Sequence, residues 1–276
     1  MATGTTPTTP ASEDRGVRSP GRAAIAAPHL RTDRWWVPPL VTAVGLGIFV
    51  VYATWRAFAN SHYYAAPYIS PFYSPCLASN CVDMKGGADW ALFGSWWGLS
   101  PALLVLIFPL GFRLTCYYYR KAYYRGIWSS PPACAVAEPH AKYSGETRFP
   151  LILQNSHRYF FYLAVIVAGI LTYDAVLGFR DAHGNWGHMG LGTLVLLANV
   201  ALIWAYTVSC HSCRHVIGGK LRHFSKHPVR YRLWGWVGTL TARHMLLAWS
   251  SLISVGLADL YVYLVSSGAF DDPRFF

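Results

Sequence analysis

Five long apolar segments constrain the fold of this 276-residue chain more than any other feature. A helix needs roughly 20 apolar residues to cross the hydrocarbon core of a bilayer. Segments of about this length occupy Pro38–Ala57, Ala91–Thr115, Tyr159–Leu177, Gly190–Val208 and Met245–Val265. Only 13% of the chain is charged, where a soluble domain has about 25%. The sequence therefore predicts an all-α integral membrane bundle of five transmembrane helices within residues 35–270.

The two ends of the chain have a different character. Residues 1–34 are rich in Thr, Pro, Ala and Arg and lack the apolar core of a signal peptide, so we expect a disordered tail there. Residues 271–276 are expected to form a short tail at the opposite end. Trp35, Trp36 and Trp55 flank the first apolar segment. Aromatic rings of this kind gather at the depth of lipid headgroups.

Lysine and arginine residues gather on one side of the predicted membrane. They crowd the N-terminal tail and the loops 118–158 and 211–244. The other side has few, namely Arg56 at the membrane edge, Lys85, Arg180 and Arg274. Loops that stay in the cytoplasm carry the excess of these cations, which predicts a cytoplasmic N-terminus and an outside C-terminus. The net charge of +11 follows mainly from this topology, so we do not expect nucleic-acid binding.

Two of the six cysteines fall in the predicted outer loop. Cys76 and Cys81 are five residues apart in the sequence Ser-Pro-Cys-Leu-Ala-Ser-Asn-Cys. Disulfides persist in oxidising compartments, so we expect these two cysteines to form a short structural bridge.

Cysteine and histidine recur at the inner ends of four consecutive apolar segments. The second segment ends at Cys116, the third begins beside His157, the fourth ends at Cys210, and the fifth begins beside His244. Because successive segments run in opposite directions, all four residues are expected at one depth near the cytoplasmic face. Ionisable groups at the membrane are functional candidates by default. Cys213 is one helical turn from Cys210 and is the alternative thiolate ligand.

Thiolate and imidazole ligands together suit soft or borderline metals. A Rieske-type [2Fe–2S] cluster has two thiolates on one iron and two imidazoles on the other, and a structural zinc ion accepts the same four donors. Haem b requires two histidines that face one another from different helices, and the first two apolar segments contain none. The histidines available to a haem are His62, His183 and His188 outside, and His157, His211, His215 and His244 inside. All three cofactors stay open on the residues alone.

The five-segment layout, the basic inner loops, and Phe149-Pro150 followed by Ser156-His157-Arg158 at a helix start resemble the membrane anchor of succinate dehydrogenase (respiratory complex II). More narrowly, the whole resembles the single-chain anchor of actinobacteria. The resemblance implies a quinone-binding, electron-transfer subunit of the respiratory chain and tricarboxylic acid cycle, without a complete active site of its own. It also implies a multi-pass protein of the bacterial inner membrane, with a flavoprotein and an iron–sulfur protein as cytoplasmic partners, and an assembly that can form higher oligomers.

The resemblance further implies a quinone site near the cytoplasmic surface that includes the Ser…His-Arg signature. We therefore expect Ser156 and Arg158 in that site, together with the nearby Arg113 and Tyr206. For the electron relay we interpret Cys116, His157, Cys210 and His244 as ligands of a Rieske-type [2Fe–2S] cluster. The alternatives are a haem b-bearing, cytochrome b-like quinone oxidoreductase subunit, or a zinc-stabilised membrane transporter or scaffold.

Overall fold

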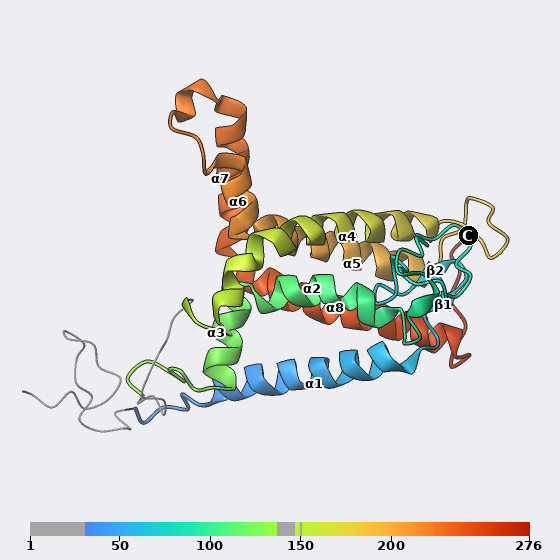
Figure 1. Ribbon diagram of the computed structural model, residues 1–276, viewed down its shortest axis with the longest axis horizontal. Coiled ribbons are helices and arrows are strands. Elements are labelled where there is room, and N and C mark those ends of the chain that lie inside the picture. Colours follow the sequence, from blue (N-terminus) through green and yellow to red (C-terminus); the bar gives the residue numbers. More distant parts are fainter. Residues whose placement is uncertain (1–30, 137–146, 150) are drawn as a thin grey trace, which may run out of the picture.

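The computed structural model describes residues 31–136, 147–149 and 151–276, so most of the predicted N-terminal tail lies outside the described residues. Four long helices run along a common axis: α1 (Val37–Ala59), α4 (His157–Leu177), α5 (Leu191–Ser209) and α8 (His244–Ser266) (Figure 1). A 3₁₀ segment, η3 (Leu151–Ser156), leads into α4, and the shorter α2 (Ala102–Leu114) lies along the same axis. The structure is mostly helical, as the sequence predicted.

Each of the four long helices is long and apolar enough to cross a membrane. The predicted span Ala91–Thr115 was wrong in its bounds, because residues 91–101 hold only the 3₁₀ turn η1 (Gly94–Trp96) before α2 begins. Gly98 interrupts this stretch, and Pro101 fits the start of a helix but not its interior. After α2 the chain bends by 80° into α3 (Tyr117–Gly126). The described helices thus supply four spans, or five if the bent α2–α3 pair counts as one.

The loop between α1 and α2 folds into a cap on one end of the bundle. It contains the short antiparallel strands β1 (Tyr64–Ala65) and β2 (Tyr68–Ile69), with Tyr64 opposite Ile69. The rings of Tyr63 and Tyr73 stack with centroids 4.5 Å apart and are buried. The aromatic residues of this loop therefore form the core of the cap.

The end of the chain is tied to the same cap. Asp272 accepts hydrogen bonds from the hydroxyls of Tyr68, at 2.7 Å, and Tyr261, and from the backbone N–H of Gly192, at 2.8 Å. Burial raises the pKa of Tyr68 to about 12, so this phenol remains a hydrogen-bond donor at neutral pH. His188 Nε2 lies 3.0 Å from the same phenolic oxygen. The C-terminal segment is thereby fixed at the end of the bundle where the cap lies.

A disulfide joins Cys76 to Cys81 within the cap. A bridge that closes so short a loop stabilises a fold by about 2 kcal/mol in the chain-entropy description. We expect the Cys76→Ser, Cys81→Ser double variant to lower the unfolding free energy by this amount without changing the metal content of the protein. Thermal unfolding in detergent with and without reductant measures the effect. Labelling of both thiols by maleimide in untreated membranes would show that the bridge does not form.

A buried ion pair attaches α1 to the rest of the bundle. Arg56 of α1 contacts Asp259 of α8 through two bonds, Nε to Oδ2 at 2.7 Å and Nη2 to Oδ1 at 3.1 Å, and both side chains are fully buried. The Asp259 carboxylate also accepts from the hydroxyls of Tyr52, at 2.6 Å, and Ser70. Arg56 Nη1 and Nη2 also donate to the carbonyls of residues 61 and 62. Every nitrogen of the guanidinium and both carboxylate oxygens therefore have a hydrogen-bond partner, which a buried charge pair needs to be tolerated.

The start of α1 and the C-terminus lie at opposite ends of the helical bundle (Figure 1). With the basic residues of loops 118–158 and 211–244 at the same end as the start of α1, we expect the C-terminus outside. Alkaline phosphatase fused after Phe276 should then be active in whole cells, and green fluorescent protein at that position should be dark. The opposite pair of results would place the C-terminus in the cytoplasm and contradict the predicted topology.

Candidate functional site

The four predicted ligands lie at the end of the bundle opposite the cap and form two Cys–His pairs. His157, at the start of α4, points its Nε2 at the sulfur of Cys210, 3.1 Å away. His244, at the start of α8, points its Nε2 at the sulfur of Cys116, 3.4 Å away. The residues of each pair come from different parts of the chain, so only the bundle brings them together.

Each histidine is held from its other side by a hydroxyl group. Thr115 Oγ1 lies 2.9 Å from His157 Nδ1, and Ser209 Oγ lies 2.7 Å from His244 Nδ1. An Nδ1–H donated to a hydroxyl oxygen leaves Nε2 free to act as a metal ligand, and partners of this kind orient the histidines of metal sites.

The arrangement is crossed. Thr115 and Cys116 are adjacent in the sequence, and so are Ser209 and Cys210. Each dipeptide orients one histidine with its hydroxyl and faces the other histidine with its thiol. Thr115 and Ser209 were missed by sequence reasoning. The signal that could have found them is a hydroxyl residue directly before a cysteine at two helix ends.

The backbone explains why both thiols point inward. Cys116 and Cys210 adopt nearly the same extended conformation, with φ/ψ of −68°/129° and −66°/141°. Cys210 is the C-cap of α5 and the N-cap of α6 (His211–Gly218), and Cys116 follows Thr115, the C-cap of α2, and is the N-cap of α3. The Cys210 sulfur accepts the N–H of Ser212 at 3.4 Å. Both thiols therefore face the interior at a junction between two helices.

Aromatic rings shield the two pairs. Phe112 stacks on His157 with centroids 5.0 Å apart, Tyr206 stacks on His244 at 5.1 Å, and these two rings lie 5.3 Å from each other. Cys116 is 2% exposed and Cys210 is 0% exposed, and both belong to the same apolar cluster as Phe112 and Tyr206. Water is largely excluded from the sulfur atoms.

The alternative ligands lie close by. The donor atoms of His157, Cys210 and His211 all lie within 4.8 Å of one another, although His211 is exposed. The ring of His211 stacks on that of His157, with centroids 5.4 Å apart and planes 18° from parallel. Cys213 packs against the same apolar cluster and is half-buried.

Of the four predicted quinone residues, two lie in the interior of the bundle and two lie at its surface. Arg113 donates to the Tyr119 hydroxyl at 2.6 Å and to Ser251 Oγ at 3.1 Å, and its guanidinium lies 4.8 Å from the centre of the Tyr206 ring. The Tyr206 hydroxyl is buried and has no hydrogen-bond partner among the described residues. Ser156 Oγ donates to a carbonyl of its own turn, and Arg158 is exposed. Only Arg113 and Tyr206 therefore face the interior beside the Cys–His pairs.

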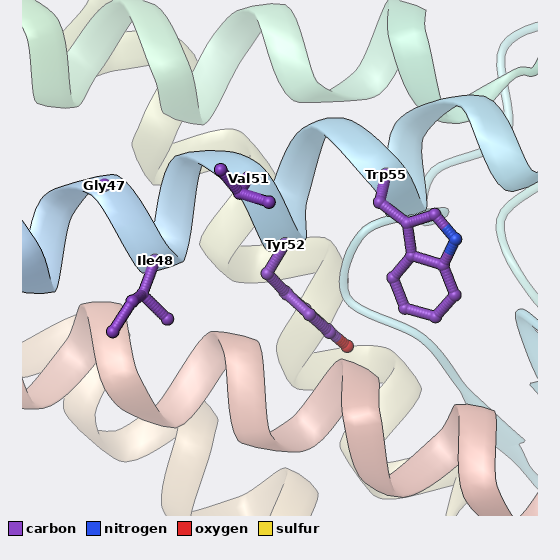
Figure 2. A pocket seen from close by; sticks show the side chains of 5 residues that line it. All are labelled: Gly47, Ile48, Val51, Tyr52 and Trp55. Carbon is purple, nitrogen blue, oxygen red and sulfur yellow. The ribbon is translucent and has the colours of Figure 1, made fainter.

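A separate groove lies along α1 (Figure 2). It has a volume of about 580 Å³ and is lined by Gly47, Ile48, Val51, Tyr52 and Trp55. Its lining is almost wholly apolar, and the Tyr52 hydroxyl is already bonded to Asp259. The groove contains none of the predicted ligand or quinone residues, so we assign it no role in electron transfer.

Comparison with known proteins identifies relatives. A sequence model of the family described as "Actinobacterial succinate dehydrogenase subunit SdhC" matches residues 37–268. A solved structure described as "Mycobacterium smegmatis Sdh1 complex in the apo form" contains a chain that is 55% identical, with a TM-score of 0.83. That alignment covers 95% of this chain and 98% of the other. No curated protein matches.

Proposed function

Because the chain belongs to the family of actinobacterial succinate dehydrogenase SdhC subunits, we propose that it anchors the complex and passes succinate-derived electrons to quinone. The resemblance seen in the sequence is thereby confirmed at the level of the family, and the chain is a multi-pass protein of the bacterial inner membrane. Its partners are a flavoprotein and an iron–sulfur subunit, which dock on the cytoplasmic face of the bundle. Quinone enters from the membrane.

The observation that carries the proposed relay is the crossed arrangement of Thr115, Cys116, His157, Ser209, Cys210 and His244. Two inward thiols and two imidazoles, each imidazole fixed by a hydroxyl, are the donor types of a Rieske-type [2Fe–2S] cluster. They lie here as two mixed Cys–His pairs, whereas the cluster would need both thiols on one iron and both imidazoles on the other. Such a cluster supplies one-electron transfer at a potential well above that of an all-thiolate cluster. This potential suits acceptance of electrons from succinate. The chain contributes position, burial and exclusion of water around the sulfurs.

Haem fits these residues less well. The rings of His157 and His211 stack with centroids 5.4 Å apart, which leaves no room for a porphyrin between them. His157 and His244 each point Nε2 at a cysteine sulfur and not at each other, so this second pair does not face across a haem-sized gap either. Zinc accepts the same donors as the cluster but carries no electrons. Iron and sulfide content distinguishes the two.

We place the quinone headgroup against Arg113 and Tyr206, with Ser156 and Arg158 at the rim. A guanidinium and a phenol are both donors to a quinone carbonyl. The support is the buried Tyr206 hydroxyl, since a buried polar group without a partner calls for an explanation. Its ring stacks on His244, so a quinone bonded there would lie next to the relay.

Tyr206→Phe tests the quinone site because it removes only the hydroxyl and keeps the ring. Since that hydroxyl has no partner among the described residues, we expect unchanged thermal stability. Loss of one hydrogen bond to quinone should raise the KM for quinone about 2- to 10-fold, the equivalent of about 0.5–1.5 kcal/mol. The matched control is Tyr162→Phe, whose phenol is exposed on α4. If both variants have parental KM and kcat, Tyr206 does not bind quinone.

Arg158→Leu decides whether the rim contributes. Arg158 is exposed, so its removal should alter quinone KM less than Arg113→Leu does. An unchanged KM for Arg158→Leu removes that residue from the site without affecting the assignment of Tyr206.

A further inference from the structure

The hairpin of α6, η4 (Phe224–Lys226) and α7 (Pro228–Ala242) is a distinct part of the inner end. It stands across the direction of the long helices and extends past the side of the bundle (Figure 1). The site and its quinone residues leave the outer part of this hairpin without a role.

The hairpin has a fixed shape. Trp234 of α7 packs so closely on α6 that a Cβ added at Gly218 would lie 2.3 Å from its ring. The Arg214 guanidinium lies 4.0 Å from the centre of the same ring, and Arg230 Nε donates to the carbonyl of residue 217 at 2.8 Å. Trp234 therefore fastens the two helices together from one face of α7.

The opposite face of α7 carries an uncovered apolar stripe. Val229, Leu233, Trp236 and Leu240 follow one another at spacings of four, three and four residues, which places them on one side of a helix. Val229 is 68% exposed, Leu233 46% and Trp236 59%, and Leu240 is half-buried. The buried Val237, four residues after Leu233 and three before Leu240, borders the stripe and marks where α7 packs against the rest of the protein. None of the residues that the structure describes covers this stripe.

The surroundings of the stripe carry charge of one sign. The chain contains no Asp or Glu between Asp181 and Asp259. Lys220, Arg222, Lys226 and Arg232 are exposed on the hairpin. A cationic element with exposed aliphatic and tryptophan side chains is complementary to a surface that offers both phosphate anions and hydrocarbon.

The depth of the hairpin is set by its two attachments. It leaves α5 after Ser209 and returns to α8 at His244, which are the ends of two membrane-spanning helices. An element that lies crosswise at this level runs along the bilayer surface, over lipid rather than over the bundle.

We propose that the α6–α7 hairpin binds the anionic phospholipid surface of the leaflet at this end of the bundle. The stripe of Val229, Leu233, Trp236 and Leu240 enters the boundary between headgroups and acyl chains, and the four cations bind lipid phosphates. Interfacial helices combine these two contributions. Each Lys or Arg at an anionic surface strengthens binding about fivefold. The assignment is independent of the relay and of the quinone site.

The test measures the depth of α7 in the assembled complex. A nitroxide is attached at Leu233→Cys in a Cys134→Ser background, and the complex is placed in nanodiscs of phosphatidylglycerol or of phosphatidylcholine. The control label is at Gly235→Cys, off the stripe, where an added side chain meets open space. Power saturation with oxygen reports contact with hydrocarbon, and saturation with a water-soluble nickel chelate reports contact with water.

In phosphatidylglycerol we expect oxygen to relax the label at 233 more than the chelate does, and the reverse at 235. The oxygen preference at 233 should shrink in phosphatidylcholine, and also in phosphatidylglycerol after Lys226→Gln with Arg232→Gln. A label at 233 that is open to the chelate would overturn the proposal by placing the stripe in water. A label shielded from both reagents would overturn it equally, by showing that a protein subunit covers the stripe. Succinate–quinone turnover of each labelled complex confirms that the variants are assembled.

Discussion

Replacing both His157 and His244 by Ala is expected to abolish succinate-driven reduction of quinone while leaving reduction of an artificial dye by succinate intact. Each histidine faces a buried sulfur at 3.1 Å or 3.4 Å, so the double variant removes one donor from each Cys–His pair. Dye reduction persists because the flavin and its substrate site are in a separate soluble subunit. The loss should be about 100-fold or more, since the proposed relay then lacks two of its four donors.

The measurement is the pair of rates, succinate to quinone and succinate to dye, on purified complex. His183→Ala is the matched control, because His183 is exposed at the opposite end of the bundle. The complex must retain its soluble subunits for the comparison to hold, which gel filtration establishes. Normal quinone reduction by the double variant, or an EPR spectrum that keeps every cluster signal of the parent, contradicts the relay.

Asp259→Asn is expected to destabilise the membrane bundle by about 3–5 kcal/mol, the usual consequence of breaking a buried ion pair from one side. The variant leaves the Arg56 guanidinium fully buried without its counter-charge. Asp259 also accepts hydrogen bonds from Tyr52 of α1 and Ser70 of the cap. Removing its charge therefore weakens the contacts of α8 with both α1 and the cap. Thermal unfolding of the purified complex in one detergent provides the comparison.

Asp174→Asn supplies the matched control. Asp174 lies near the outer end of α4 and is also buried, but its carboxylate oxygens have no hydrogen-bond partner among the described residues. Its amide replacement should therefore leave stability unchanged or raise it, because no charge pair is lost. Replacing Arg56 by Met and Asp259 by Leu together should recover most of the stability that Asp259→Asn loses. Equal effects of Asp259→Asn and Asp174→Asn would mean that the ion pair does not hold α1 in place.

The sequence predicted the helical class and four of the spans to within a few residues, and it placed Cys116, His157, Cys210 and His244 at one end of the bundle, where they lie as two Cys–His pairs. These features follow from local length and composition and from the alternation of direction between successive spans. The bounds of the second span could not be read in this way, because the apolar run continues through Gly98 and Pro101 although the helix does not. Hydropathy records burial in lipid and does not record backbone breaks.

The hydrogen-bond partners of the two proposed histidine ligands also escaped sequence reasoning. Thr115 and Ser209 are unremarkable as single residues, and only the packing of α2 against α4 and of α5 against α8 brings their hydroxyls to the two imidazoles. The same holds for Arg56, which by its position reads as a residue at the membrane edge. Its partner Asp259 is 203 residues away, and no local pattern announces the pair.

The central claim is that Cys116, His157, Cys210 and His244 hold an iron–sulfur cluster. The most direct measurement is the iron and acid-labile sulfide content of purified complex. Because the iron–sulfur partner has clusters of its own, the informative quantity is the difference between the parent and the Cys116→Ser, Cys210→Ser double variant. The account predicts that this variant loses about two iron and two sulfide per complex, the content of one [2Fe–2S] cluster, and loses no zinc. Equal iron and sulfide in the two proteins, or loss of a single zinc instead, would contradict it.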